Sequence, residues 1–418
     1  MFRNILCCFI LVALSSCNSE NSTKPMGEDI FVPEPNISQV ISSQVVEFNL
    51  NENNEFSRNS LDAFAKRISN VRILGLGEQT HGAGSVFSLK VALIKYLHQK
   101  HGFDLFILES GLYDVEKIYQ QAKQEQRIKD LAPGNIFYMY ANSEEMTPLF
   151  DYINEQANSN KPLKLVGFDS QHTGELSNKG LVNDLTLALK AIDETQVISS
   201  EWFELSKKIQ QVLDGSIDRL SLLDEKVFFQ QLDTLALTFS TAKQGFWHRI
   251  SKGLIAQAKR QWGIEDNRSL EMGENVKWWA EQYPDKKIVV WAHTWHLTKQ
   301  GNQQVNAGQV ISKHFKDQYY MVHYTAEQGE YLDYVDMSRQ QVASYHKNSL
   351  ESITSEQLTS PINFIDIESL ALVEDTLQVF SNDYQQTLPS SEWAKYFDGI
   401  FVFKEATPSS YLPEKIVN

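Results

Sequence analysis

The sequence predicts an α/β fold, in which a mixed, mostly parallel sheet is flanked by helices and carries a helical insertion or lid. Short apolar segments of strand length alternate with amphipathic segments of helical length, which is the pattern of βαβ units. A long internal region, about residues 180–262, has helical periodicity and almost no strand pattern. We interpret it as a helical subdomain packed over the sheet.

The first βαβ unit lies in the first quarter of the chain. A helix is expected to begin near Asn59, because apolar residues recur at helical spacing as far as Ile68. Val71–Leu76 is an apolar run of strand length, Val86–His101 is a second amphipathic helix, and Asp104–Leu108 is another strand. A strand, a helix and a second strand within about forty residues form a βαβ unit.

The same alternation returns later. The expected segments are a helix at Asp151–Gln156, a strand at Leu163–Phe168, a helix from about Asn267 to Tyr283, a strand at Lys287–Trp291, and terminal strands at Tyr319–Tyr324, Tyr331–Val335 and Phe397–Phe403. Some of the terminal strands are expected to be antiparallel, at one edge of the sheet.

The first seventeen residues have the pattern of a secretory signal peptide. Arg3 gives a basic start, and Ile5–Leu14 is apolar and uncharged but too short to span a bilayer as a mature helix. The segment Leu14–Cys17 (LSSC) resembles a bacterial lipobox, whose cysteine is lipidated and becomes the first residue of the mature chain. The alternative is an ordinary signal that is cleaved nearby. Because Asn18 is not the aspartate associated with inner-membrane retention, we expect lipid anchoring at Cys17 in the outer membrane, on its periplasmic or surface side.

The chain is therefore divided into a signal peptide (1–17), a polar, proline-containing tether (18–40) and a folded domain (41–418). All three cysteines, Cys7, Cys8 and Cys17, lie in the signal peptide. The mature domain thus has no disulfide, thiol nucleophile or cysteine metal site. The formal net charge of −15, without any cluster of five or more basic residues, argues against a nucleic-acid partner.

Four of the expected strands run directly into ionisable residues. Val71–Leu76 leads to Glu78 and His81, and Asp104–Leu108 leads to Glu109. The two later strands end in the same way, at Asp169 and at the pair His293 and His296. A polar residue after a strand is often only a turn or a helix cap. Ligands of open α/β sheets bind outside the carboxyl ends of the strands, so we expect the four groups to share one crevice.

The segment GEQTHG (77–82) carries an acid and a histidine three positions apart. A tight turn can aim both Glu78 and His81 at one site, where the carboxylate would fix the imidazole tautomer and support a general base. The segment is not a phosphate loop, because the Walker spacing and its lysine are missing. No Gly-x-Ser-x-Gly elbow indicates a serine nucleophile.

The segment AHTWH (292–296) leaves two interpretations open. Two histidines and an acid can hold zinc, but the HExxH motif is absent. A His-x-x-His pair after a strand can equally orient a substrate. We predict no cofactor, with a divalent metal as the alternative.

At these residues the sequence resembles the erythromycin esterase family, hydrolases that open macrolide lactones. The resemblance rests on LGLGEQTHG (74–82), LFILES (105–110), YANSEEMTPLFDYI (140–153), VGFD (166–169), the helix with Arg268, Met272 and Asn275, KIVVWAHTWH (287–296) and FDGIFVF (397–403). It covers residues from about 60 to 403 in the same order and is loosest in the central helical region.

The resemblance implies a role for each matching residue. Glu78 and His81 match the acid and the histidine thought to activate the attacking water. Lys90 occupies a place usually held by arginine, where a cation could bind a carbonyl or oxyanion, and Glu109 matches an acidic strand-end residue. His293 and His296 match the family's second histidine pair, and His293 is implied to be catalytic. We assign His296, together with Asp169 and Arg268, to substrate binding.

Three departures put macrolide specificity in doubt. The usual Arg-Asp reads Arg268-Ser269, the following Met-Ala reads Met272-Gly273, and Lys90 gives up the bidentate fork of arginine.

The sequence therefore predicts hydrolysis of a carboxylic ester or lactone, a small-molecule substrate, by water that His81 deprotonates. Glu78 would orient His81, while His293 and Lys90 would polarise the carbonyl. The alternatives are a metal-dependent hydrolase with Glu78, His81, Glu109 and the HTWH histidines as ligands, and a non-catalytic envelope protein that binds a ligand such as haem. The substrate stays open: an antibiotic, with a role in resistance, a glycan ester or a lipid.

Overall fold

The computed structural model describes residues 45–50, 55–301, 304–343, 349–370, 378–380, 384 and 387–412. The expected signal peptide (1–17), with the lipidation site Cys17, and the tether (18–40) lie outside the described residues and stay predictions. No helix in the described part of the chain is both long enough and apolar enough to cross a membrane.

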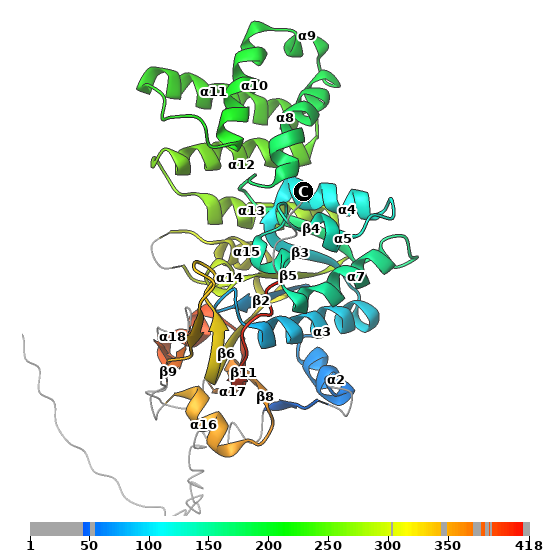
Figure 1. The fold of residues 1–418 in the computed structure, drawn as a ribbon, viewed down its shortest axis with the longest axis vertical. Helices are drawn as coiled ribbons and strands as arrows, with labels where there is room; N and C mark the ends of the chain where they lie inside the picture. Colours follow the sequence, from blue (N-terminus) through cyan, green and yellow to red (C-terminus); the bar gives the residue numbers. More distant parts are fainter. Residues whose placement is uncertain are drawn as a thin grey trace, which may run out of the picture. The chain divides into compact units, whose positions relative to one another are not determined.

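A nine-stranded mixed sheet forms the centre of the domain (Figure 1). Its main path has the order β1-β8-β11-β6-β2-β5-β3-β4, and the short β7 pairs with β6. The six strands from β11 to β4 are parallel, whereas β8 is antiparallel to β11 and β1 to β8. Its strands are β1 (Val46–Phe48), β2 (Ile73–Glu78), β3 (Phe103–Gly111), β4 (Lys164–Asp169), β5 (Lys287–His293), β6 (Tyr319–Leu332), β7 (Arg339–Gln341), β8 (Ile362–Asp366) and β11 (Gly399–Ala406); β9 (Gln378–Phe380) and β10 (Thr387–Pro389) form a separate ribbon.

Helices cover both faces of this sheet. Along β2, Ile73 packs into one hydrophobic core and Leu74 into the other, because successive side chains of a strand point to opposite faces. A strand buried on both faces has the continuous apolar sequence seen here. The helices around the sheet are α2 (Arg58–Arg67), α3 (Gly84–His101), α4 (Leu112–Ala122), α5 (Ile128–Leu131), α6 (Tyr138–Ala141), α7 (Thr147–Gln156), α13 (Arg268–Gln282), α14 (Thr294–Leu297), α15 (Ala307–Phe315), α16 (Leu350–Gln357), α17 (Ile367–Leu370) and α18 (Ser390–Tyr396), with 3₁₀ turns at Glu144–Met146 and Lys316–Gln318.

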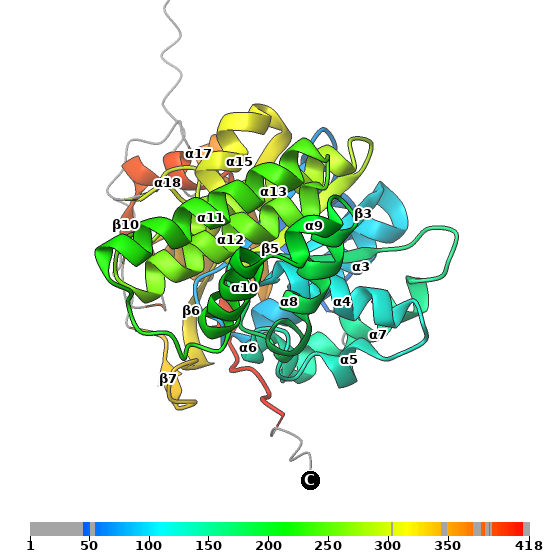
Figure 2. The same ribbon diagram turned by 90° about the horizontal axis from the view of Figure 1, so that it is seen from above.

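A lobe of helices lies beyond the β4 edge of the sheet (Figure 1). It consists of α8 (Glu175–Lys190), α9 (Glu194–Val197), α10 (Ser200–Leu213), α11 (Leu222–Thr241) and α12 (Gly245–Gln261). Figure 2 shows α11 and α12 lying side by side. The side chains of Ser199 and Ser221 cap the first turns of α10 and α11, so these helix starts are encoded locally.

The expected fold class is confirmed: the sheet is mixed and mostly parallel, helices flank it, and residues 180–262 form helices and connecting loops without a strand. One expected strand is wrong. Tyr331 and Leu332 continue β6, and the chain then turns from residue 333 toward β7, so Tyr331–Val335 is not a strand of its own. The expected terminal strands, now β6 and β11, run parallel to β2; antiparallel pairing is present at this edge, but β11 makes it with β8, a strand that was not expected.

Candidate active site

The carboxyl ends of four neighbouring parallel strands, β2, β5, β3 and β4, meet at one cleft of about 830 Å³. In the paired register of β2 and β5, Glu78 stands beside His293. Glu78 and Lys90 are fully buried and do not belong to the lining of the cleft. The sequence-predicted site residues that line it are His81, Glu109, Asp169, Arg268, His293 and His296.

Glu78 and His81 form a close pair where β2 ends. Nδ1 of His81 lies 3.0 Å from Oε1 of Glu78. The chain can turn directly after His81 because Gly82 has no side chain: a Cβ there would lie 1.7 Å from the carbonyl oxygen of Leu332. A carboxylate can only accept hydrogen bonds, so Nδ1 carries the proton and donates it to Glu78 in the hydrogen bond. The lone pair of the neutral ring is then on Nε2. This is the arrangement of a general base held by an acid.

Both carboxylate oxygens of Glu78 accept further hydrogen bonds. Oε1 accepts one from the hydroxyl of Tyr140 at 2.6 Å, and Oε2 accepts from the ammonium of Lys90 and the indole Nε1 of Trp291. Burial raises the pKa of Glu78, but Lys90 and His81 together outweigh burial and lower it. Glu78 is therefore an anion at neutral pH, with its orientation fixed from several sides.

The direct carbonyl-binding role expected of Lys90 does not fit the structure. Its side chain comes from α3, which packs on a face of the sheet, and is fully buried. The ammonium donates to Glu78 and, at 3.0 Å, to the carbonyl oxygen of Leu76, and lies 4.6 Å from the ring centre of Trp291. Burial lowers the pKa of Lys90 to about 8, although Glu78 opposes the shift. Lys90 thus stabilises Glu78 from behind and does not face the cleft.

Aromatic rings surround His81. The ring centres of Phe137, Tyr334 and Tyr140 lie 4.8, 5.2 and 5.9 Å from that of His81, each in an edge-on arrangement. Tyr334 belongs to the loop between β6 and β7, and its carbonyl oxygen accepts a hydrogen bond from the hydroxyl of Tyr138. Rings around Glu78 and His81 exclude water and strengthen the hydrogen bond between the carboxylate and the imidazole.

His293 lies beside His81, with 5.2 Å between the ring centres. Its Nε2–H donates to the carbonyl oxygen of Gln79 at 3.0 Å, and its Nδ1 accepts from the backbone N–H of Trp295 at 3.3 Å. Burial and the neighbouring His81 lower the pKa of His293 to about 3, so the ring is neutral at neutral pH. Because both ring nitrogens bond to backbone groups, His293 can polarise a carbonyl, as expected from sequence, only after releasing Gln79.

A second charged cluster is centred on Arg268, at the start of α13. Nε and Nη2 of its guanidinium bond to Asp169 at 2.7–3.2 Å, and Nη2 also bonds to Glu109 at 3.2 Å. Nη1 contacts Nε2 of His296 at 3.3 Å. Burial raises the pKa of Glu109, but His296, His81 and Arg268 lower it to about 2. Glu109 also accepts the backbone N–H of His293 at 2.8 Å, which links this cluster to the histidine pair.

The side chains do not favour the metal-dependent alternative. Across the described residues, no group of three or more His, Cys, Asp or Glu side chains is arranged to hold a metal ion. The carboxylates that the alternative would use are bonded to cations instead: Glu78 to Lys90, and Glu109 to Arg268.

Four aromatic residues of the site were not identified from the sequence: Phe137, Tyr140, Trp291 and Tyr334. Tyr140 and Trp291 lie inside segments of the family resemblance, but only the fold shows that their polar atoms meet Glu78. Tyr334 was expected within a strand, Tyr331–Val335, but it belongs to the loop after β6, and it reaches the cleft because β6 extends past the carboxyl edge of β2.

Comparisons with known proteins identify a family and similar folds. The family model for erythromycin esterase matches residues 98–406. The protein YbfO of Bacillus subtilis (strain 168), provisionally named a hydrolase, is 28% identical over 365 residues, which is 78% of this chain and 77% of YbfO. Erythromycin esterase type I of Escherichia coli is 24% identical over 280 residues, which is 58% of this chain and 65% of that protein. The solved structure of an erythromycin esterase EreC mutant in its open conformation has a TM-score of 0.64 at 14% identity, over 87% of this chain and 98% of that one.

Proposed function

The chain belongs to the erythromycin esterase family, and membership of this family supports a hydrolase-type function, so we propose that the protein hydrolyses a carboxylic ester or lactone by water-mediated attack. The observation that carries this proposal is the pair of His81 and Glu78 at the cleft. An imidazole whose Nδ1–H is held by a carboxylate keeps its Nε2 lone pair available to remove a proton from water.

In the first step, Nε2 of His81 takes a proton from a water molecule as its oxygen attacks the ester carbonyl. The imidazolium that forms is stabilised by the anionic carboxylate of Glu78. When the tetrahedral intermediate collapses, the carbon–oxygen bond to the leaving group breaks, and the imidazolium returns its proton to the departing alkoxide. His81 is then neutral again, and the products are an acid and an alcohol, or a hydroxy acid from a lactone.

We assign the binding of the carbonyl oxygen to Arg268 in place of Lys90. Arg268 lines the cleft and bonds to Asp169 of β4 and Glu109 of β3, and 21% of its side chain is exposed. Its Nε and Nη2 are held by Asp169 and Glu109, whereas Nη1 faces His296 and bonds to neither carboxylate among the contacts described. A rigidly held guanidinium can donate from Nη1 to a developing oxyanion with little reorganisation.

Substitution of the proposed base tests the mechanism. His81→Ala is expected to lower kcat for an ester or lactone that the wild type hydrolyses by about 10²–10⁴-fold, because general-base catalysis contributes that much. A panel of macrolides, simple lactones and simple esters identifies the substrate, and the thermal unfolding curve shows that the variant is folded. A folded His81→Ala protein with wild-type turnover would contradict the assignment.

We further propose that the protein is held in the cell envelope by a lipid on Cys17, with the outer membrane as its location. The support is the segment Leu14–Cys17 followed by Asn18. Radiolabelled palmitate should be incorporated into the wild type and not into Cys17→Ala, and the wild type should fractionate with outer membranes. Equal labelling of both proteins would contradict lipidation at this cysteine.

A further inference from the structure

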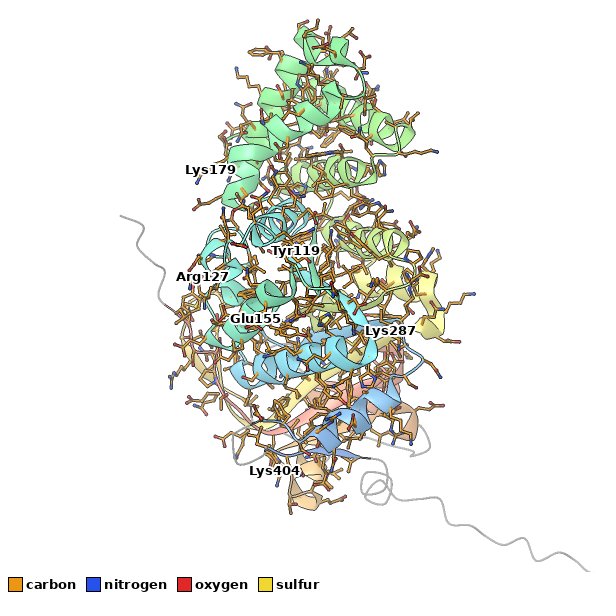
Figure 3. The ribbon with its side chains drawn as sticks, turned by 90° about the vertical axis from the view of Figure 1, so that its right-hand side faces the viewer. Tyr119, Arg127, Glu155, Lys179, Lys287 and Lys404 are labelled. Carbon is orange, nitrogen blue, oxygen red and sulfur yellow. The ribbon has the colours of Figure 1, made fainter. Side chains whose placement is uncertain are left out.

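A second cavity, of about 430 Å³, lies at the β4 edge of the sheet, away from the catalytic cleft. It is bounded by α4, the last turns of α13, the first residues of α12 and single residues of β4 and α8. Figure 3 labels Tyr119 on α4, directly below the helices of the lobe. The two cavities share no lining residue. Its aromatic residues, which we name the aromatic groove, are Tyr113, Phe246, Trp247, Trp278, Trp279 and Tyr283.

The rings of the aromatic groove form one continuous strip. The ring centre of Trp247 lies 6.4 Å from that of Tyr113 and 5.2 Å from that of Phe246. The strip continues from Phe246 to Trp278 at 6.2 Å and from Trp278 to Trp279 at 4.3 Å. Trp279 is buried and anchored by a bond from its Nε1–H to the carbonyl of Gly167, whereas Phe246, Trp247 and Trp278 are only partly buried.

Polar side chains border this strip, and their charges cancel. Lys117 pairs with Asp184 at 2.6 Å, and Lys164 pairs with Glu116 at 3.4 Å. Oε2 of Glu116, the atom that faces Lys164, is buried and accepts no hydrogen bond of ordinary geometry from the described residues, so a lone pair of this oxygen can still accept a bond. The amides of Gln120 and Gln282, at the exposed rim, add donors and acceptors.

We propose that the aromatic groove binds a neutral saccharide. Ligand sites of about 300–1,000 Å³ combine apolar walls with a few polar groups that fix orientation. The C–H face of a sugar ring packs on partly exposed indoles, while its hydroxyls bond to carboxylate, amide and ammonium groups at the rim. Two acids and two lysines give the rim no net charge, which disfavours a strongly charged ligand, and the density of polar groups disfavours a lipid chain.

This inference does not rest on the proposed hydrolysis. Asp114 lines the catalytic cleft and Tyr113, the residue before it, lines the aromatic groove, so α4 separates the two. A saccharide bound at the groove would leave the strand ends open to a substrate.

Titration of the full-length mature protein with neutral hexasaccharides tests the proposal. The probes are the β-1,4-linked glucose, α-1,4-linked glucose and β-1,4-linked N-acetylglucosamine hexamers, followed by tryptophan fluorescence and calorimetry. At least one should bind with a Kd at or below about 1 mM. Trp278→Ala and Trp247→Ala should each weaken that binding about tenfold or more, because each removes a stacking surface.

Matched variants separate the groove from general effects. Phe203→Ala, which removes an aromatic side chain that is 67% exposed on α10, should leave the Kd unchanged. Gln282→Ala at the exposed rim should weaken binding about fivefold. This variant keeps the proposal testable if a tryptophan variant fails to fold. Ester hydrolysis should be unaffected in all four variants. Absence of binding by every hexamer up to about 10 mM, or binding that survives the tryptophan and glutamine substitutions, would overturn the proposal.

Discussion

The two charged centres of the catalytic cleft, the Glu78–His81 pair and the Arg268 cluster, are built in opposite ways. At the first, one buried carboxylate is the acceptor and an imidazole, a phenol, an indole and an ammonium all bond to it. At the second, one cation is the donor and two carboxylates hold it, while part of its side chain faces the cleft. In the proposed mechanism, the first arrangement controls a proton, and the second presents a fixed positive charge to a substrate.

Breaking the first centre should have the largest effect. Glu78→Gln should lower kcat/KM about 10²–10⁴-fold, because His81 loses its orienting acid. It should also lower the free energy of unfolding by about 3–5 kcal/mol, since the buried charge of Lys90 loses its partner.

A double variant separates these two effects. Glu78→Gln combined with Lys90→Met should recover most of the stability, because no unpaired charge remains, without recovering activity. Urea unfolding and steady-state kinetics give both quantities. Recovery of activity in the double variant would show that Glu78 serves only to neutralise Lys90.

Altering the second centre should have a smaller effect on kcat/KM. Arg268→Lys keeps the charge but loses the fork that bonds to Asp169 and Glu109. We expect kcat/KM to fall roughly 10- to 100-fold, by the loss of one charge-assisted hydrogen bond. A larger loss than that of Glu78→Gln would reverse the ranking of the two centres.

The pH dependence of stability tests the second centre without an activity measurement. The pKa of Glu109 is about 2 in the fold against an ordinary value of 4.5, so the unfolded chain binds a proton first as the pH falls. The stability that this carboxylate contributes, about 3 kcal/mol, is therefore fully present above about pH 4.5 and is lost as the pH approaches 2. Urea unfolding at about pH 7, 5 and 3 should show a shallower decline for Glu109→Gln than for the wild type. Parallel declines would contradict a lowered pKa.

The parts of the fold with local periodicity were predictable from the sequence. Val71–Leu76 and Val86–His101 correspond to β2 and α3 within a few residues, because a doubly buried strand and an amphipathic helix each have a distinct pattern. The strand β8 (Ile362–Asp366) was not foreseen, since five residues beside a proline resemble many loops and its pairing with β11 is set by tertiary contacts.

The residues of the site also divide into those that the sequence predicts and those that only the packing reveals. The sequence placed Glu78, His81, Glu109 and His293 at strand ends, and parallel topology brings strand ends together. The orientation of Lys90 was not predictable, because a residue of a facing helix can point toward the cleft or into the core, and only packing against Trp291 decides which.

A double-mutant cycle on kcat/KM for His81→Ala, Glu78→Gln and the combined variant tests most directly whether Glu78 acts through His81. If the acid works only by holding the imidazole, the double variant should be no slower than His81→Ala alone. If the free-energy losses of the two single variants add in the double variant, the result would contradict action through His81 and would give Glu78 an independent part in the chemistry.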